Sequence, residues 1–253
     1  MEQQGYVKLE NQNGIGYITF YHPSSNAMPG YLLAEMVQKI EEANANTDIK
    51  VMVLQSEGRT FCAGASFDEL LQLHDKESAV RFFMGFARVI NVMRKTNKFI
   101  IAQVQGKAVG GGVGLIAAAD YAMATEKAAI RLSELSIGIG PYVIAPAVKR
   151  KIGVAAFGEL AINATTWHTA FWAREKGLFA KVFDSQSVLE DEVMVLAQKL
   201  ATYDNVATAR LKKDLWEGTE NWDVLLPEKA QISAQLTLRE YTRKNLKKFK
   251  KES

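Results

Sequence analysis

The chain has 253 residues, of which 48% are hydrophobic and 23% charged, and its formal net charge is +3. This composition is typical of a globular protein with a sizeable core, and so small a charge gives no argument for nucleic-acid binding. A single cysteine, Cys62, excludes an internal disulfide and a cysteine-based metal cluster. Apolar runs stay shorter than the ~20 residues of a membrane-spanning helix, and the first five residues lack a signal-peptide pattern. We therefore expect a cytoplasmic protein without a membrane partner or a metal.

The first half of the chain alternates strand-like and helix-like segments. Residues 6–10 and 16–21 are rich in β-branched and aromatic residues and predict a hairpin, with a turn at 11–14. Apolar residues at helical spacing, and short apolar runs, predict helices at 30–44 and 79–93 and buried strands at 50–55 and 99–104. Such alternation indicates an α/β fold, with a parallel sheet and helices on its faces.

The second half is predicted to be almost wholly helical beyond about residue 143. One strand-like piece at 178–183 interrupts the pattern. The predicted helices span residues 154–162, 169–176, 187–202, 206–216 and 227–251. Without a linker or low-complexity tract, this part is expected to pack on the sheet core.

Two glycine-containing loops follow two of the predicted strands. The first carries A-G-A at 63–65 after strand 50–55, and the second carries G-G-G at 110–112 after strand 99–104. Glycine lets a backbone approach a bound group closely, and a helix start adds partial positive charge. Ligands collect at the carboxyl ends of parallel strands. Each loop could therefore supply one N–H group to a single ligand oxygen.

A lone carboxylate, Glu134, follows in the apolar segment I-R-L-S-E-L-S-I-G-I-G-P. A glutamate between Leu132 and Leu135 requires a partner or a raised pKa, which favours a functional role over a structural one. An anion-stabilising backbone and one isolated acid are the minimum for proton transfer beside a carbonyl. We therefore predict that Glu134 is a general acid and base.

Other chemistry-bearing residues are expected to be structural. Asp120 ends the glycine-rich helix, and Asp68 and Glu69 stand in a first helical turn, where acids complement the helix dipole. Cys62 has no basic neighbour in the sequence and is predicted to be a packed side chain. Phe86 either lines a pocket or fills the core.

The C-terminal stretch 239–251 is basic, with Glu240 as its one acid before the last residues. Its cations serve as a solvated face, as a site for a polyphosphate ligand or as a nucleic-acid site. They alternate with Leu238, Tyr241, Leu246 and Phe249, which predicts a helix docked on one face. A docked helix favours a compact polyphosphate over nucleic acid.

Three motifs in order carry a family resemblance: F-C-A-G-A-S-F-D-E-L, V-Q-G-K-A-V-G-G-G-V-G-L-I-A-A-A-D and L-S-E-L-S-I-G-I-G-P. They resemble the enoyl-CoA hydratase/isomerase (crotonase) superfamily, with similarity from about residue 6 to 182. The resemblance implies a spiral ββα core over residues 1–195 and a helical trimerisation region over 196–253. It also implies an acyl-CoA substrate, no separate cofactor because CoA is part of that substrate, and a homotrimer or hexamer.

The same resemblance assigns the site. It places the oxyanion-holding N–H groups on Ala65 and Gly111 and the acid–base role on Glu134. The further candidates for substrate binding are Ala63, Gly64, Gly110, Gly114 and Tyr142.

Gly114 departs from the pattern of two-acid hydratases, which have glutamate at this position. A single acid is enough to move a proton between carbons, which is isomerase chemistry. The segment L-S-E-L-S-I-G-I-G-P-Y-V-I-A-P-A-V, however, resembles the bacterial methylglutaconyl-CoA hydratases of leucine breakdown. Hydration of methylglutaconyl-CoA is thus the specific expectation. A single-glutamate double-bond isomerase and a non-catalytic binding protein with a basic tail are the alternatives.

Overall fold

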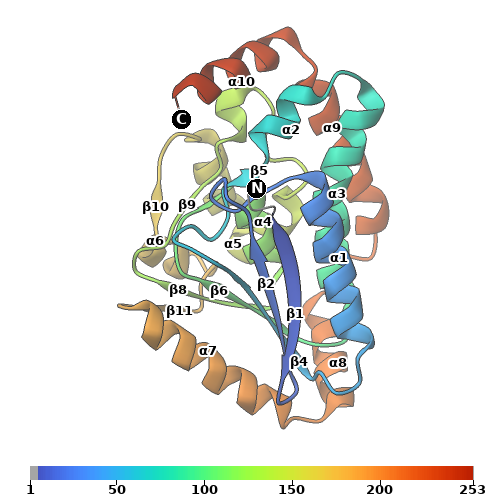
Figure 1. Ribbon diagram of the computed structural model, residues 1–253, viewed down its shortest axis with the longest axis vertical. Coiled ribbons are helices and arrows are strands. Elements are labelled where there is room, and N and C mark those ends of the chain that lie inside the picture. The colour runs from blue at the N-terminus through green and yellow to red at the C-terminus, as the bar shows by residue number, and fades with distance from the viewer. Residues whose placement is uncertain (1–4, 253) are drawn as a thin grey trace.

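The computed structural model describes residues 5–252, with side chains described to residue 248. Residues 1–4, on which part of the signal-peptide prediction rests, lie outside the described residues. A six-stranded sheet in the order β1-β2-β4-β6-β8-β11 forms the centre of the molecule (Figure 1). Its strands are β1 (Tyr6–Gln12), β2 (Ile15–Tyr21), β4 (Val51–Ser56), β6 (Ile100–Val104), β8 (Tyr121–Thr125) and β11 (Lys181–Phe183).

Helices cover both faces of this sheet. Successive side chains of β4 point to opposite sides, so its apolar residues must be packed on each face. Met52 and Leu54 join the main core, which includes α1 (Gly30–Ala45) and α3 (Lys76–Lys95). Val53 packs instead with Leu189 of α7 (Gln186–Ala201) on the other face. The predicted hairpin, parallel sheet and covering helices are therefore confirmed. The predicted boundary at 195/196 falls inside α7.

Five short strands, which the sequence patterns did not reveal, position the loops at the sheet edge. They are β3 (Ala27–Met28), β5 (Gly64–Ala65), β7 (Ala108–Val109), β9 (Ala129–Arg131) and β10 (His168–Thr169). β3 pairs with β5, while β9 lies between β10 and β7 in a small three-stranded sheet. Strands of two or three residues carry too few side chains to show a period of two.

Two of the predicted helices have different bounds. The helix predicted at 154–162 is the second half of α5 (Ala145–Ile162), which breaks at Gly153, where φ is 76°. The single helix predicted at 227–251 is wrong, since the chain forms α9 (Trp222–Thr237) and α10 (Glu240–Glu252). After the turn between them, α10 contacts α2 (Phe67–Gln72) and the short 3-10 helix η1 (Glu134–Ile137) as well as α9, and its residues Thr242 and Leu246 are buried.

The remaining helices are α4 (Gly111–Ala118), α6 (Ala170–Glu175) and α8 (Asn205–Leu215). Trp216 and Trp222, at the ends of α8 and α9, belong to the main core, so the helical part packs on the sheet as expected. Among the described residues, no helix has the length and apolar character needed to cross a bilayer.

Candidate active site

The first glycine loop ends in β5, which presents the Ala65 N–H group to a cavity. Ser66 N–H donates to Met28 O at 3.3 Å, toward β3. Neighbouring N–H groups of an extended chain point to opposite sides, so that of Ala65 points away from β3. Ala65 lines the cavity. Ala65, which the family resemblance assigned to the oxyanion hole, thus lies on the cavity wall, and its role there stays a prediction.

The second loop presents the Gly111 N–H group at the start of α4. Gly110 precedes this helix with φ of 51° and ψ of −115°, a conformation that glycine adopts readily. Val113 N–H donates to Gly110 O at 2.9 Å, which closes the first turn. The N–H group of Gly111 lies in the first turn of α4, where no carbonyl group of the helix can accept its hydrogen bond. It also lies at the positive end of the helix dipole.

The two loops touch each other through Gly64. A Cβ on this residue would stand 2.7 Å from Val109 O and 3.4 Å from Gly111 N, so a side chain would push the loops apart. The φ of +86° at Gly64 adds strain for any other residue. The close approach places both N–H donors on adjacent backbone segments.

Glu134 reaches this point because β9 runs parallel to β7, with Val109 paired to Arg131. Both chains therefore leave the small sheet at the same edge. A Cβ on Gly110 would stand 2.7 Å from Glu134 Oε1, so the carboxylate lies directly over the second glycine loop. Glu134 Oε2 is enclosed and has no hydrogen-bond partner among the described residues. An enclosed, unpaired carboxylate oxygen is available to a ligand or a water molecule.

The surroundings of Glu134 tune its proton affinity. Burial raises the pKa of this carboxyl to about 7, while its own backbone N–H and the positive charge of Arg131 oppose the rise. A pKa near neutrality lets one group accept and return a proton at physiological pH.

We expect kcat/KM to rise as the pH is raised through about 7, because the base step needs the ionised form of Glu134. The measurement is a pH profile of kcat/KM on both sides of this value. A profile that is already flat above the ordinary glutamate pKa of 4.5 would contradict the assignment.

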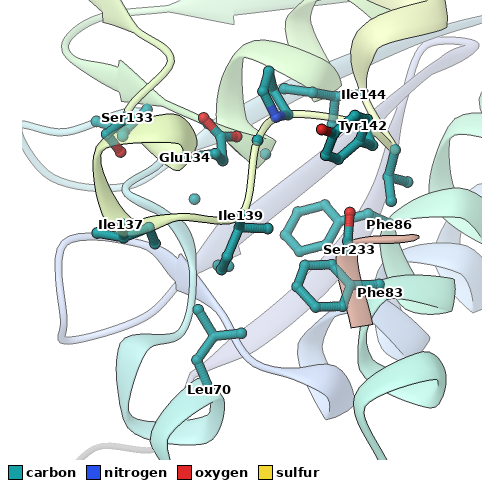
Figure 2. A pocket seen from close by; sticks show the side chains of 18 of the residues that line it. Leu70, Phe83, Phe86, Ser133, Glu134, Ile137, Ile139, Tyr142, Ile144 and Ser233 are labelled. Atoms are coloured by element: carbon teal, nitrogen blue, oxygen red, sulfur yellow. The ribbon is translucent and has the colours of Figure 1, made fainter. Parts of the chain in front are cut away.

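The cavity opens to solvent and lies between the two glycine loops, η1 and apolar side chains of α2 and α3. Figure 2 shows Glu134 and apolar side chains converging on the same space. All the cavity candidates from the sequence except Gly114 line it, and Phe86 does so too. Its other walls, which sequence reasoning missed, are Phe67, Leu70, Phe83, Val109, Ser133, Ile137, Ile139, Gly140, Pro141, Val143, Ile144 and Ser233.

Gly114 lies within α4 and does not line the cavity. A Cβ on it would stand 2.4 Å from Ile144 Cγ2, so Ile144 fills the space that a side chain would need. Ile144 itself lines the cavity. An apolar side chain therefore stands where the two-acid pattern would bring a second carboxylate.

The residues predicted to be structural are placed accordingly. The side chain of Asp120 is 4% exposed and pairs with the Lys212 ammonium at 2.8 Å. Burial raises the pKa of the Cys62 thiol to about 12, which makes it a poor nucleophile. Glu69 accepts a hydrogen bond from Gly30 N at 2.6 Å, so it caps α1 and not its own helix.

The basic helix α10 docks beside the cavity. Leu246 and Thr242 are buried, and the Arg243 guanidinium donates to Leu70 O and Leu71 O at 2.8 and 2.6 Å. The prediction of a helix docked on one face is confirmed, although Tyr241 is 64% exposed and lies outside that face. The side chains of Phe249, Lys250 and Lys251 lie outside the described residues.

Within residues 5–252, no group of three or more His, Cys, Asp or Glu side chains is arranged to hold a metal ion. The site instead combines backbone N–H donors, one acid and an apolar cavity. Such a combination is chemically able to hold a negatively charged oxygen and to move a proton beside it.

Comparisons with known proteins indicate an enzyme with chemistry of this kind. A family model described as enoyl-CoA hydratase/isomerase matches residues 10–251. Ethylmalonyl-CoA decarboxylase of Mus musculus is 31% identical over 134 residues, 53% of this chain and 42% of that protein. The 2,3-dehydroadipyl-CoA hydratase of Escherichia coli K12 is 28% identical over 214 residues, 84% of this chain and 82% of that protein.

The crystal structure of enoyl-CoA hydratase from Bacillus halodurans superimposes with a TM-score of 0.89 at 23% identity, covering 96% of this chain and 99% of that one. This likeness confirms the crotonase-type fold. The chain belongs to the enoyl-CoA hydratase/isomerase family. It is therefore an acyl-CoA enzyme of the hydratase or isomerase kind, and the alternative of a non-catalytic binding protein is set aside.

Proposed function

We propose that this enzyme hydrates a branched unsaturated acyl-CoA, with methylglutaconyl-CoA as the specific candidate and Glu134 as the only protein acid and base. The observation that carries the proposal is the enclosed, unpaired Oε2 of Glu134, whose carboxylate lies against Gly110 in the second glycine loop. Ala65 and Gly111 would donate to the thioester oxygen. One acid is sufficient for hydration if it first accepts and then returns the same proton.

The chemistry would proceed in two steps. Glu134 takes a proton from water, whose oxygen adds to the β-carbon while the electron pair moves to the thioester oxygen. The resulting enolate is held by the N–H groups of Ala65 and Gly111. Glu134 then returns its proton to the α-carbon, so that one water molecule is added across the double bond. A pKa of about 7 suits both steps.

The choice of substrate is supported by the L-S-E-L-S-I-G-I-G-P-Y-V segment and by the names of relatives. Ethylmalonyl-CoA and 2,3-dehydroadipyl-CoA, which name two relatives, both have a second carboxylate on the acyl group. Methylglutaconyl-CoA shares this feature.

A single-glutamate double-bond isomerase is the second candidate. It is favoured by Ile144, which fills the space beside Gly114 and leaves Glu134 as the one acidic side chain on the described cavity wall. An isomerase needs only to remove a proton from one carbon and return it to another, with no water in the cavity.

A panel of thioesters distinguishes the two candidates. The panel contains methylglutaconyl-CoA, its analogue without the distal carboxylate, an unbranched 2-enoyl-CoA and a 3-enoyl-CoA. We expect methylglutaconyl-CoA to gain the mass of water far faster than its uncharged analogue, with loss of the enoyl absorbance. Equal hydration of the two would sink the substrate assignment. Conversion of 3-enoyl-CoA without mass change, and no hydration, would establish the isomerase instead.

The proposal extends to the setting of the enzyme. We propose that it acts in the cytoplasm as a homotrimer or hexamer, without a cofactor other than the CoA of its substrate. Self-association is supported by exposed apolar side chains on two helices, among them Val154 and Ile162 of α5 and Leu211 of α8. The cations of α10 would bind the phosphates of CoA, and nucleic acid is not proposed as a partner.

A further inference from the structure

Ser233 brings a hydroxyl group into the enclosed part of the apolar cavity. It lies on α9, far in sequence from both glycine loops, and is 1% exposed. Figure 2 shows its hydroxyl directed away from α9, toward the space between Phe86 and Tyr142. A helix that otherwise contributes apolar packing thus presents one polar atom to the ligand space.

This hydroxyl makes no hydrogen bond with any of the residues that the structure describes. Serine and threonine within helices commonly donate to a carbonyl in the preceding turn. Thr237, one turn further along α9, does so, with its Oγ1 at 2.8 Å from Ser233 O. The buried neighbours Ala230 and Ala234 show that a side chain without a hydroxyl is accepted on this helix. Ser233 instead lies on the cavity wall, so its hydroxyl can be reached by a ligand atom that enters the cavity and can donate a hydrogen bond to it.

The position of Ser233 fixes which part of the ligand it meets. The thioester oxygen is assigned to the Gly111 N–H group, and the Phe86 ring packs so closely on Gly111 that a Cβ there would stand 2.2 Å from it. Ser233 lies beside Phe86 in the cavity. The charged nucleotide of CoA requires solvent, so the enclosed region around Ser233 is left for the acyl group.

We infer that the acyl group carries a hydrogen-bond-accepting oxygen at its distal end, and that Ser233 Oγ–H donates to this oxygen. The inference rests on the proposed use of acyl-CoA thioesters and deepens it. The Tyr142 hydroxyl lies on the opposite side of the space and offers a second donor. No Lys, Arg or His side chain lines the cavity in the described part of the chain, so hydroxyl groups are the available donors. A carboxylate and a ketone both provide such an oxygen.

The test measures binding of saturated acyl-CoA thioesters, which cannot be hydrated or isomerised. Three of equal chain length are compared, ending in a carboxylate, a methyl ketone or an alkyl group. We expect Ser233→Ala to raise Kd about tenfold for at least one oxygen-bearing thioester and to leave the alkyl thioester unchanged. The two oxygen-bearing probes tell a charged tip from a neutral one. Thr237→Val is the matched control, because it removes a hydroxyl of α9 that is bonded within the helix.

The inference is overturned if Ser233→Ala changes Kd equally for all three thioesters, or for none of them. It is also overturned if Thr237→Val produces the same selective loss, since the hydroxyl facing the cavity would then have no special part. These outcomes are independent of turnover. Failure of the proposed function appears separately, as absence of hydration and isomerisation in the wild-type enzyme.

Discussion

Glu134→Gln lowers kcat at least ~10²-fold in our account, the low end of what general acid–base catalysis contributes. Glutamine keeps the shape and the hydrogen-bonding capacity of the side chain, but it cannot take a proton. Binding of the acyl-CoA should change little, because the backbone N–H groups and the cavity walls remain. The measurements are kcat by steady-state kinetics and Kd by titration with a saturated thioester.

Glu126→Gln is the matched control, since Glu126 is an exposed carboxylate outside the cavity. It should leave kcat unchanged. Near-normal turnover of Glu134→Gln would defeat the assignment of Glu134.

The Glu134→Gln variant should also have a larger free energy of unfolding than the wild type above pH 7. The folded-state pKa of Glu134 lies above its ordinary value of 4.5, so its ionisation costs stability as the pH rises through that interval.

Lys212→Met is expected to lower the free energy of unfolding by about 3–5 kcal/mol, the usual result of removing one partner of a buried ion pair. Lys212 Nζ lies 2.8 Å from Asp120 Oδ2, and the two side chains are 2% and 4% exposed. The ammonium also donates to Thr96 Oγ1 at 2.6 Å and to Lys98 O at 2.8 Å. Methionine would fill the volume but leave the Asp120 charge buried without its cation.

Urea unfolding measures this loss, and Lys213→Met is the control because Lys213 is the exposed neighbour on the same helix. The control should shift the unfolding free energy by less than about 0.5 kcal/mol. Adding Asp120→Asn to Lys212→Met should recover part of the loss, since the unpaired charge is then gone. A loss below about 1 kcal/mol for Lys212→Met would show that the Lys212–Asp120 ion pair contributes little to the stability of the protein.

Much of the fold could be predicted because its long elements have strong periods. The strands β4 and β6 are mostly apolar, and α3 and α7 show helical spacing over several turns. The turn between α9 and α10 could not be predicted, because apolar residues at helical spacing continue through Leu238. The end of α9 is determined by the tertiary packing of α10. α10 bonds to α2 through Arg243, a contact between distant segments.

The candidate site could be located from the sequence where its residues stand in short motifs. The family resemblance of these motifs singled out Ala65, Gly111 and Glu134, and the structure brings all three to one cavity. Ser233 and Ile144 could not be assigned in the same way. Ser233 lies on a helix outside the motifs, and no sequence pattern shows that Ile144 packs beside Gly114. The sequence shows at Gly114 that a second acid is absent. It does not show that Ile144 fills the space that a side chain at this position would need.

Solvent deuterium incorporation at the α-carbon tests most directly whether Glu134 moves a proton beside a thioester held in this site. Wild-type enzyme and Glu134→Gln are incubated with methylglutaconyl-CoA in heavy water, and the acyl-CoA products are read by mass spectrometry and NMR. We predict one deuterium at the α-carbon of the hydrated product with the wild type, and incorporation at least ~10²-fold slower with the variant. Equal incorporation by both, or none by the wild type with any of the panel thioesters, would contradict the account.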